Sequence, residues 1–264
     1  MFTKTLGIIA ITIKQKLTYR EALWFGIIAT SASIFIYYFL WNAVFSDAAV
    51  IEGYNFQMMI TYIIIARVLA SQFSSGINGT LASWIYDGSI ATELLRPFGI
   101  VRSLFALRIG EFCQFVIFKA LPITLIAAFL LGASPPAGFG ALLLFILSIL
   151  ISLVLLFFFE LMVGILAFYT MDVHAVRFAK DTILTILSGG LVPLFLFPLW
   201  LQDIIRLLPF HHLVATPIDI YLGVLSYREA LWALTSLGLW VIVMLALAML
   251  FFQLAMKRIV VQGG

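Results

Sequence analysis

The sequence predicts an all-α integral membrane protein with six transmembrane helices. Of its 264 residues, 64% are hydrophobic and 10% are charged, whereas an ordinary soluble domain is about 45–50% apolar and about 25% charged. Apolar runs of about 20 residues, the length that crosses a bilayer as a helix, recur along the chain. No polar stretch between them is long enough for a separate globular unit, so residues 1–264 are interpreted as a single membrane domain.

Polar or proline-containing segments separate the six apolar runs. Gly132 and the Pro135-Pro136 pair close the third run, because consecutive prolines cannot continue a helix. The fourth run is longer than a bilayer requires, so we expect it to tilt, to bend near Gly164 or to project beyond the membrane. The predicted spans are about Ala22 to Phe45, Phe56 to Ile77, Ser103 to Leu131, Phe139 to Thr170, Thr182 to Trp200, and Ala230 to Met256.

The N-terminal residues 2–20 predict an amphipathic helix that lies along the membrane surface. At helical spacing Phe2, Leu6 and Ile9 share one face, and Lys4 and Lys14 lie roughly opposite them. An even number of spans places both termini on one side of the membrane.

The distribution of lysine and arginine predicts which side that is. In the six-span topology Arg206 and Arg228 fall on one side, whereas eleven others fall on the side of the termini: Lys4, Lys14, Lys16, Arg20, Arg96, Arg102, Arg108, Arg177, Lys180, Lys257 and Arg258. By the positive-inside rule both termini are expected in the cytoplasm.

Several function classes find no support in the sequence. The net charge of +3 is small and dispersed, which does not suggest nucleic-acid binding. The single cysteine, Cys113, has no partner for a disulfide. His211 and His212 are adjacent and therefore point in different directions, and with Asp219 they form no telling metal-ligand spacing, so no metal site is predicted.

The polar loop after the second span, residues 78–102, is the first candidate site. Ser89 is suited to cap a short helix and Pro97 to end the next turn. Leu94 and Leu95 are apolar where water is expected. The segment can be interpreted equally as an amphipathic stretch resting on lipid or as a docking helix for a cytoplasmic protein.

Four ionisable residues fall within the predicted spans: Arg67, Glu111, Lys119 and Glu160. Intramembrane charges are costly and usually face the bundle interior or water, where they form ion pairs or mark a pathway. Because both lie deep in their spans, we expect Arg67 to pair with Glu160. Glu111 and Lys119 share a helix face two turns apart, too distant for direct contact, so their partners must come from elsewhere.

The fifth span is predicted to be discontinuous. It contains Gly189, Gly190, Pro193 and Pro198, and a broken helix leaves backbone carbonyls that lipid cannot satisfy. The following segment, through Pro209, should therefore be buried against protein or line a watery cavity, as a movable gate above a substrate path would. The alternative is a kinked helix followed by an ordinary external loop.

Three stretches carry a resemblance to a known family: Asp87-Gly-Ser-Ile-Ala-Thr-Glu-Leu-Leu-Arg-Pro97, Ser188-Gly-Gly-Leu-Val-Pro-Leu-Phe-Leu-Phe-Pro198 and Leu208-Pro-Phe210. With the order of elements, they resemble the permease subunits of type-2 ABC exporters (ABC-2 family transporter proteins), over nearly the whole chain. The resemblance implies that residues 192–221 re-enter the outer leaflet. It also implies coupling to an ATPase through Trp84, Ile85, Asp87, Glu93, Leu94, Leu95 and Arg96.

The resemblance also sets expectations for partners. It implies cytoplasmic ABC ATPase subunits, a second permease subunit that is identical or related, and a bacterial plasma membrane location. The chain has no GxxxxGK[ST] loop, so ATP and Mg²⁺ are expected on the ATPase rather than on this chain. The expected function is export of an amphipathic, lipid-like or drug-like substrate; the alternatives are a membrane scaffold or an integral-membrane enzyme acting on lipid or cell-wall precursors.

Overall fold

A computed structural model describes Gly7 and residues 20–46, 50–74, 76–95, 99–170 and 174–257, almost all of them helical. The predicted surface helix at residues 2–20 and the coupling residue Arg96 lie outside the described residues, apart from Gly7 and Arg20. The helices that make up the long apolar segments are α2 (Arg20–Val44), α6 (Ile100–Phe115), α7 (Leu121–Leu131), α8 (Phe139–Ile165) and α12 (Tyr227–Met256).

Four segments of the described chain are long and apolar enough to cross a membrane: Leu23–Val44, Ile100–Leu131, Phe139–Phe168 and Tyr227–Met256. They match the first, third, fourth and sixth predicted spans within a few residues. A capping box between Ser226 and Glu229 begins the last of them. The segment Phe139–Phe168, which matches the fourth predicted span, runs as α-helix through Gly164 and ends in the 3₁₀ turn η2 (Leu166–Phe168).

The second and fifth predicted spans are interrupted. Helix α3 (Phe56–Ala70) has only 15 residues; a turn follows, and α4 (Ile77–Tyr86) then begins a new helix. Helix α9 (His174–Leu187) ends before the Gly-Gly pair, as predicted. Beyond it come η3 (Leu194–Leu196), α10 (Leu199–Leu207), η4 (Pro209–Leu213) and α11 (Ala215–Leu222).

A π-helical turn, η1 (Val116–Ala120), joins α6 to α7 in one continuous rod. Its cause is Pro122, which lacks an N–H group and whose ring would collide with the carbonyl of Phe118 in a regular α-helix. The ladder accommodates one extra residue, and the N–H of Leu121 bonds to the carbonyl of Val116, five residues back. Such turns are rare and occur frequently at functional sites.

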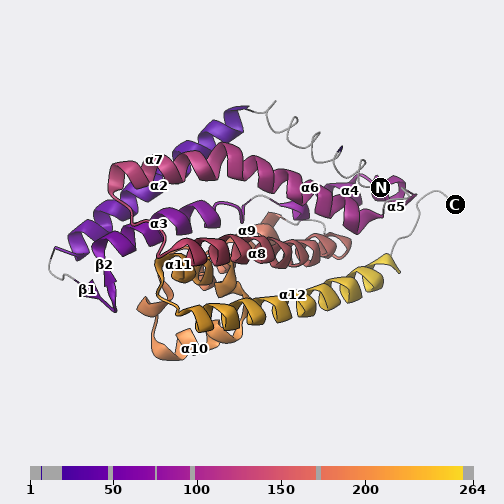
Figure 1. The fold of residues 1–264 in the computed structure, drawn as a ribbon. Helices are drawn as coiled ribbons and strands as arrows, with labels where there is room; N and C mark the ends of the chain where they lie inside the picture. Colours follow the sequence, from indigo (N-terminus) through magenta and orange to yellow (C-terminus); the bar gives the residue numbers. More distant parts are fainter. Residues whose placement is uncertain are drawn as a thin grey trace.

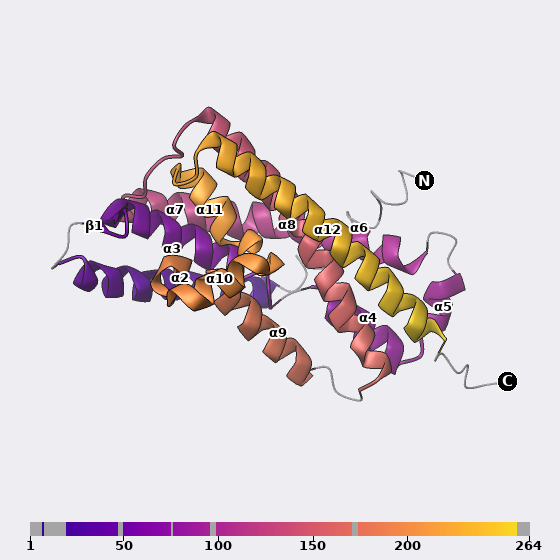
Figure 2. The ribbon, with the colours of Figure 1, turned by 90° about the horizontal axis from the view of Figure 1, so that it is seen from below.

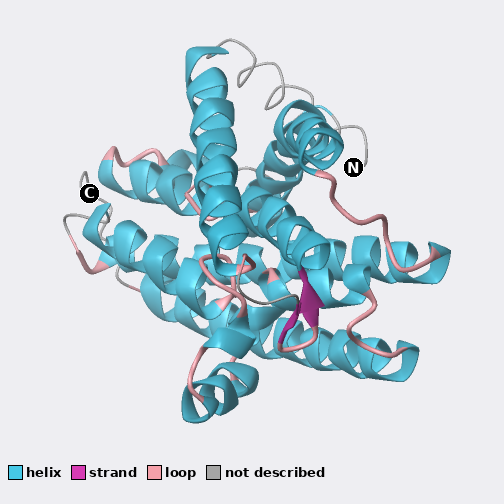
Figure 3. Ribbon diagram, turned by 90° about the vertical axis from the view of Figure 1, so that its left-hand side faces the viewer, coloured by secondary structure: helices cyan, strands magenta, loops and turns pink. Residues whose placement is uncertain are grey.

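Helix α8 forms the centre of the bundle and packs against α12, α4 and α11 (Figures 1 and 2). It approaches α4 closely at Gly164, where an added Cβ would lie 3.2 Å from the Cα of Asn78. Figure 1 places α5 (Ile90–Leu95) and the C-terminal end of α12 at one end of the molecule. The hairpin of β1 (Val50–Ile51) and β2 (Tyr54–Asn55) lies at the other end, onto which Figure 3 looks.

Candidate functional site

The candidate coupling segment consists of α4 and α5, joined by a tight turn at Asp87 to Ser89. The N–H of Ser89 donates to the Asp87 carboxylate at 2.9 Å. Hydrogen bonds from the Ser89 side chain and backbone hold the pKa of Asp87 below its ordinary value. Ser89 immediately precedes α5, where a capping residue was expected.

The sequence-predicted coupling residues differ in accessibility. Leu95 is 85% exposed at the end of α5, whereas Glu93 is buried. Trp84, Ile85 and Leu94 are half-buried against the core. The predicted polar loop at residues 78–102 starts inside α4, whose first turns are buried against α8. Among the apolar coupling residues predicted from the sequence, Leu95 is therefore the one most accessible to a partner.

A buried ionic cluster lies between α6, α8 and the break after α3. The guanidinium of Arg108 is 3.5 Å from Glu160 Oε2 and 3.8 Å from Glu111 Oε2, and it donates to Gln72 Oε1 at 3.3 Å. Arg108 is 1% exposed and Glu160 is fully buried. The Glu160 carboxylate also packs against Gly76, at the start of α4, where no Cβ would fit.

The predicted pairing of Arg67 with Glu160 is wrong. Glu160 pairs with Arg108, which the sorting of charges had placed on the cytoplasmic side. Arg67 instead donates to the carbonyl of Gly190 at 3.2 Å, and its guanidinium lies 5.1 Å from the ring centre of Tyr37. The depth of a residue in its span does not determine which helix its side chain faces.

The break after α9 is the candidate gate, and three consecutive carbonyls there accept hydrogen bonds from distant parts of the chain. Tyr62 and Arg67, both on α3, donate to the carbonyls of Gly189 and Gly190 at 3.0 and 3.2 Å. The N–H of Ala215 donates to the carbonyl of Ser188 at 3.0 Å. These three carbonyls are thus satisfied within the protein, whereas α10 in the following segment exposes Leu199 and Leu207.

The rest of the gate segment contains the predicted prolines. Pro193 and Pro198 flank η3, and Pro209, which is buried, begins η4. The side-chain amide of Gln202 donates to the carbonyls of Phe195 and Phe197 at 3.2 and 2.8 Å. The irregular backbone just before Pro198 is thus held by hydrogen bonds from one side chain, that of Gln202.

The break after α3 is satisfied in the same way, from α9. Lys180 is buried, and its ammonium donates to the carbonyl of Phe73 at 2.6 Å and pairs with Asp181 at 2.8 Å. Helix α9 therefore caps the end of α3, while Tyr62 and Arg67 of α3 cap the end of α9. This mutual capping was not predicted, because Lys180 precedes the fifth predicted span and was assigned to the cytoplasmic side with the other basic residues.

The β1–β2 hairpin also contacts the segment that follows the break after α9. Tyr54 donates to the Asp219 carboxylate of α11 at 2.7 Å, and its ring stacks on Phe195 at 4.7 Å between centroids. Burial and the neighbouring Asp219 raise the pKa of Tyr54, so its hydroxyl stays protonated and able to donate. One side chain thus contacts the segment before α10 and the segment after η4.

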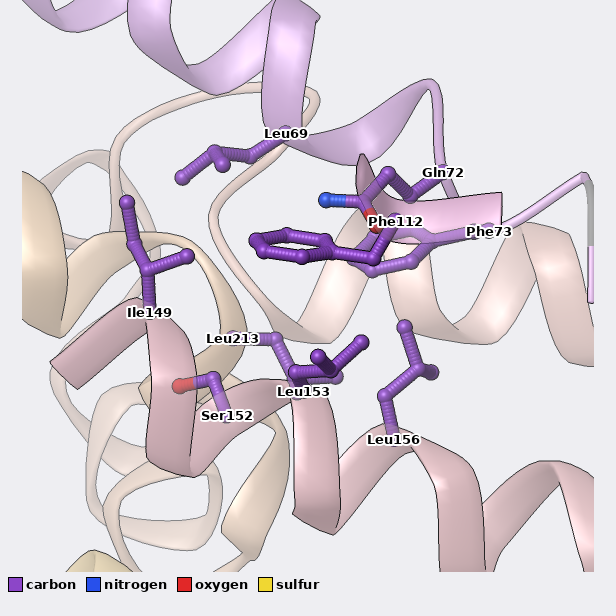
Figure 4. Close-up of a pocket in the computed structure, with 9 residues that line it drawn as sticks. All are labelled: Leu69, Gln72, Phe73, Phe112, Ile149, Ser152, Leu153, Leu156 and Leu213. Carbon is purple, nitrogen blue, oxygen red and sulfur yellow. The ribbon is translucent and has the colours of Figure 1, made fainter. Parts of the chain in front are cut away.

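A small cavity of 20 Å³, room for about one water, lies beside the ionic cluster (Figure 4). Its wall is mostly apolar, with Phe112 and Leu153 among the side chains that Figure 4 shows pointing into it. Gln72, which binds Arg108, and Ser152, which donates to the carbonyl of His212 at 2.7 Å, supply its polar groups. The cavity is too small for an exported molecule.

The two adjacent histidines make contacts within the protein. The ring nitrogens of His212 lie 3.1 Å from Thr216 Oγ1 and 3.2 Å from Ser236 Oγ, and His211 Nδ1 lies 2.8 Å from the carbonyl of Leu208. Among the described residues, no group of three or more His, Cys, Asp or Glu side chains could hold a metal ion.

Comparison with known proteins agrees with this architecture. Residues 32–263 match the family of ABC-2 family transporter proteins, which form the membrane part of ABC transporters. No curated protein matches the sequence. Because the match covers most of the 264 residues, including all the helices after the first turns of α2, the chain belongs to the ABC-2 family of transporter membrane proteins.

Proposed function

We propose that this chain is the permease subunit of an ATP-driven exporter in a bacterial plasma membrane. It would move an amphipathic, lipid-like or drug-like substrate, with energy from a separate ATPase that binds ATP and Mg²⁺. A second permease subunit, identical or related, would complete the path, and both termini would lie in the cytoplasm. Family membership supports the class.

The observation that carries the mechanism is the mutual capping of α3 and α9. The break after α3 leads into the coupling segment α4–α5, and the break after α9 is the gate. Each break is closed by side chains of the other helix. A displacement of α4 by an ATPase would therefore act on α3 and, through Tyr62 and Arg67, on the carbonyls of Gly189 and Gly190.

Affinity purification from the native host in a mild detergent tests the proposal. An ABC ATPase should co-purify with the tagged chain. Leu95→Asp should weaken this association, because it puts a charge on the exposed apolar tip of α5, while Val224→Asp, an exposed apolar position before α12, should not. Glu93 is a poorer test site because its substitution would disturb a buried side chain.

Two outcomes would contradict the proposal. Absence of any ATPase from the purified complex would remove the exporter class. Equal recovery of the ATPase with Leu95→Asp and with the wild type, at equal expression, would show that α5 is not the docking element.

A further inference from the structure

A second pocket, with a volume of 220 Å³, opens between the first turns of α8 and α12. The two helices start at the same end of the molecule and run side by side (Figures 1 and 2). The end of α11 and the turn after it form the remaining wall. None of the four charges predicted within the spans lines this pocket. Lys119, for example, lies beside α2, where a Cβ added at Gly26 would be 3.7 Å from its ammonium nitrogen.

The pocket exists because small residues meet where the two helices begin. Five of its nine lining residues are glycine or alanine: Ala137, Gly138, Ala141, Gly223 and Ala230. A Cβ added at Gly138 would meet nothing within 4 Å. Open space therefore begins at the backbone of the segment that leads into α8.

The walls of the pocket are held in place by contacts beside it. The N–H of Ala137 donates to the carbonyl of Tyr221 at 2.9 Å, and the Tyr221 hydroxyl donates to the carbonyl of Ser134 at 3.3 Å. The Tyr221 ring packs edge-on against Phe145 of α8, with 5.2 Å between ring centres. A Cβ added at Gly223 would lie 2.6 Å from the Cβ of Ala137. The pocket is thus a preformed feature of the fold.

The side chains around the mouth indicate a lipid environment. Phe139 and Leu143 on α8 are exposed, as are Tyr227 and Trp232 on α12. Tyrosine and tryptophan are enriched where the membrane meets water. The 30 residues of Phe139–Phe168 extend about 45 Å, about the thickness of a bilayer with its headgroups. The first turns of α8 and α12 therefore lie at the depth where lipid headgroups join their chains.

The chemistry of the wall selects hydrocarbon as the occupant. Among the described residues that line the pocket, Tyr227 alone has a polar side chain. An apolar cavity of about 150 Å³ stays dry and binds benzene, so by the same ratio the 220 Å³ here take about nine carbons. A peptide occupant would need hydrogen-bond partners for its N–H and C=O groups, and the wall side chains offer one hydroxyl.

We infer that this pocket is a lipid-binding site, which takes the part of a phospholipid acyl chain nearest the headgroup. The lipid comes from the leaflet that contacts the starts of α8 and α12. No charged side chain lines the pocket, so the site selects no headgroup. The bound chain fills the space between the two spans and supports α11, whose Asp219 accepts a hydrogen bond from Tyr54. The site requires only that α8 and α12 span a membrane, so it does not depend on the exporter proposal.

Photo-labelling of the full chain in vesicles of phosphatidylethanolamine and phosphatidylglycerol tests the inference. A trace of either lipid carries a diazirine in the half of one acyl chain nearest the headgroup, and mass spectrometry locates the label. The wild type should be labelled at residues 137–144 and 223–230, equally with both headgroups. Labelling of the exposed Phe35 and Phe39 on α2 corrects for contact with bulk lipid.

Two variants that fill the pocket and one control locate the effect. Ala141→Phe should lower labelling of the pocket about threefold, because a benzene-sized ring takes about two thirds of its volume. Gly138→Leu fills the pocket from the preceding segment and should also lower the labelling, so it decides the matter if Ala141→Phe does not fold. Leu143→Phe lies on α8 outside the lining residues and should be labelled as the wild type is.

Thermal unfolding of delipidated protein in dodecyl maltoside gives an independent measurement. Added phospholipid should raise the Tm of the wild type and of Leu143→Phe, because a ligand that binds the folded state stabilises it. The rise should be smaller for Ala141→Phe and for Gly138→Leu, whose own side chains occupy the site.

The inference is overturned if the folded pocket-filling variants are labelled at residues 137–144 as strongly as the wild type, or if only one headgroup class labels the site. Equal rises in Tm for the wild type and for these variants would also overturn it. Cross-linking of these residues to a second copy of the chain, in place of lipid, would identify the pocket as a subunit interface and would likewise refute the inference.

Discussion

Breaking the buried ion pair between Arg108 and Glu160 should destabilise the protein by several kcal/mol. The loss should depend on which of the two residues is replaced. Glu160→Gln leaves Arg108 with Glu111 at 3.8 Å and with Gln72. Arg108→Met leaves the Glu160 carboxylate, which is fully buried, without the guanidinium at 3.5 Å. The arginine variant should therefore be the less stable of the two.

The structure sets the size of the effect. Two unit charges 3.5 Å apart attract by about 5 kcal/mol at an effective dielectric constant of about 20, and removing one partner of a buried pair typically costs about 3–5 kcal/mol. We expect about 3 kcal/mol for Glu160→Gln and about 5 kcal/mol for Arg108→Met. For a chain of this size these losses lower Tm by about 6–12 °C and about 10–20 °C.

Thermal unfolding in dodecyl maltoside, followed by size-exclusion chromatography of the soluble fraction, measures these losses. The double variant should be more stable than the sum of the two losses predicts, by about 1–3 kcal/mol, because it removes both charges together. Arg228→Met, at an exposed position, is the control. Strictly additive losses, or two single variants that unfold with the wild type, would refute the pairing.

Three further predictions concern the gate and the topology. Gly189→Ala should lower the free energy of unfolding by at least about 2 kcal/mol more than Gly132→Ala does, and it should reduce transport. Both glycines have positive φ, 82° and 70°, but only at Gly189 would a Cβ meet a neighbour, at 2.6 Å from the Tyr62 hydroxyl. Equal stability of the two variants would remove close packing as the role of Gly189. Tyr54→Phe keeps the ring stack but loses the hydrogen bond to Asp219, so Tm should fall by the equivalent of about 2 kcal/mol, and an unchanged Tm would contradict that assignment. In a cysteine-free background, position 174 should react only with a membrane-permeant thiol reagent and position 203 with an impermeant one in intact cells; reversed labelling would overturn the topology.

The sequence predicted the long helices well because the signals that begin and end them are local. Apolar length alone located four spans. The prolines after Leu131 and the Ser226 capping box act within the turn in which they stand. The break at Gly189 was predictable for the same reason, since glycine and proline impose their backbone preferences on any surroundings.

The partners of the buried charges were not predictable, because they depend on which helices become neighbours. Arg108 lies near the start of its predicted span and so resembled a cytoplasmic residue, yet its side chain is 1% exposed among three elements. The break after α3 did leave a signal, the Ser-Ser-Gly triplet that ends at Gly76 inside an apolar run. The π-helical turn also had a visible determinant, Pro122, whose effect on helix register requires the structure to recognise.

The π-helical turn has a consequence for how this protein can change in evolution. In a regular membrane helix, loss of one residue rotates everything beyond it by about 100° and exchanges lipid-facing and buried side chains. Between Val116 and Ala120 the extra residue is already accommodated as a bulge. A relative without a proline at position 122 could therefore lose one residue here and keep both Arg108 and the α7 face in place, whereas a chain that retains the proline needs the insertion.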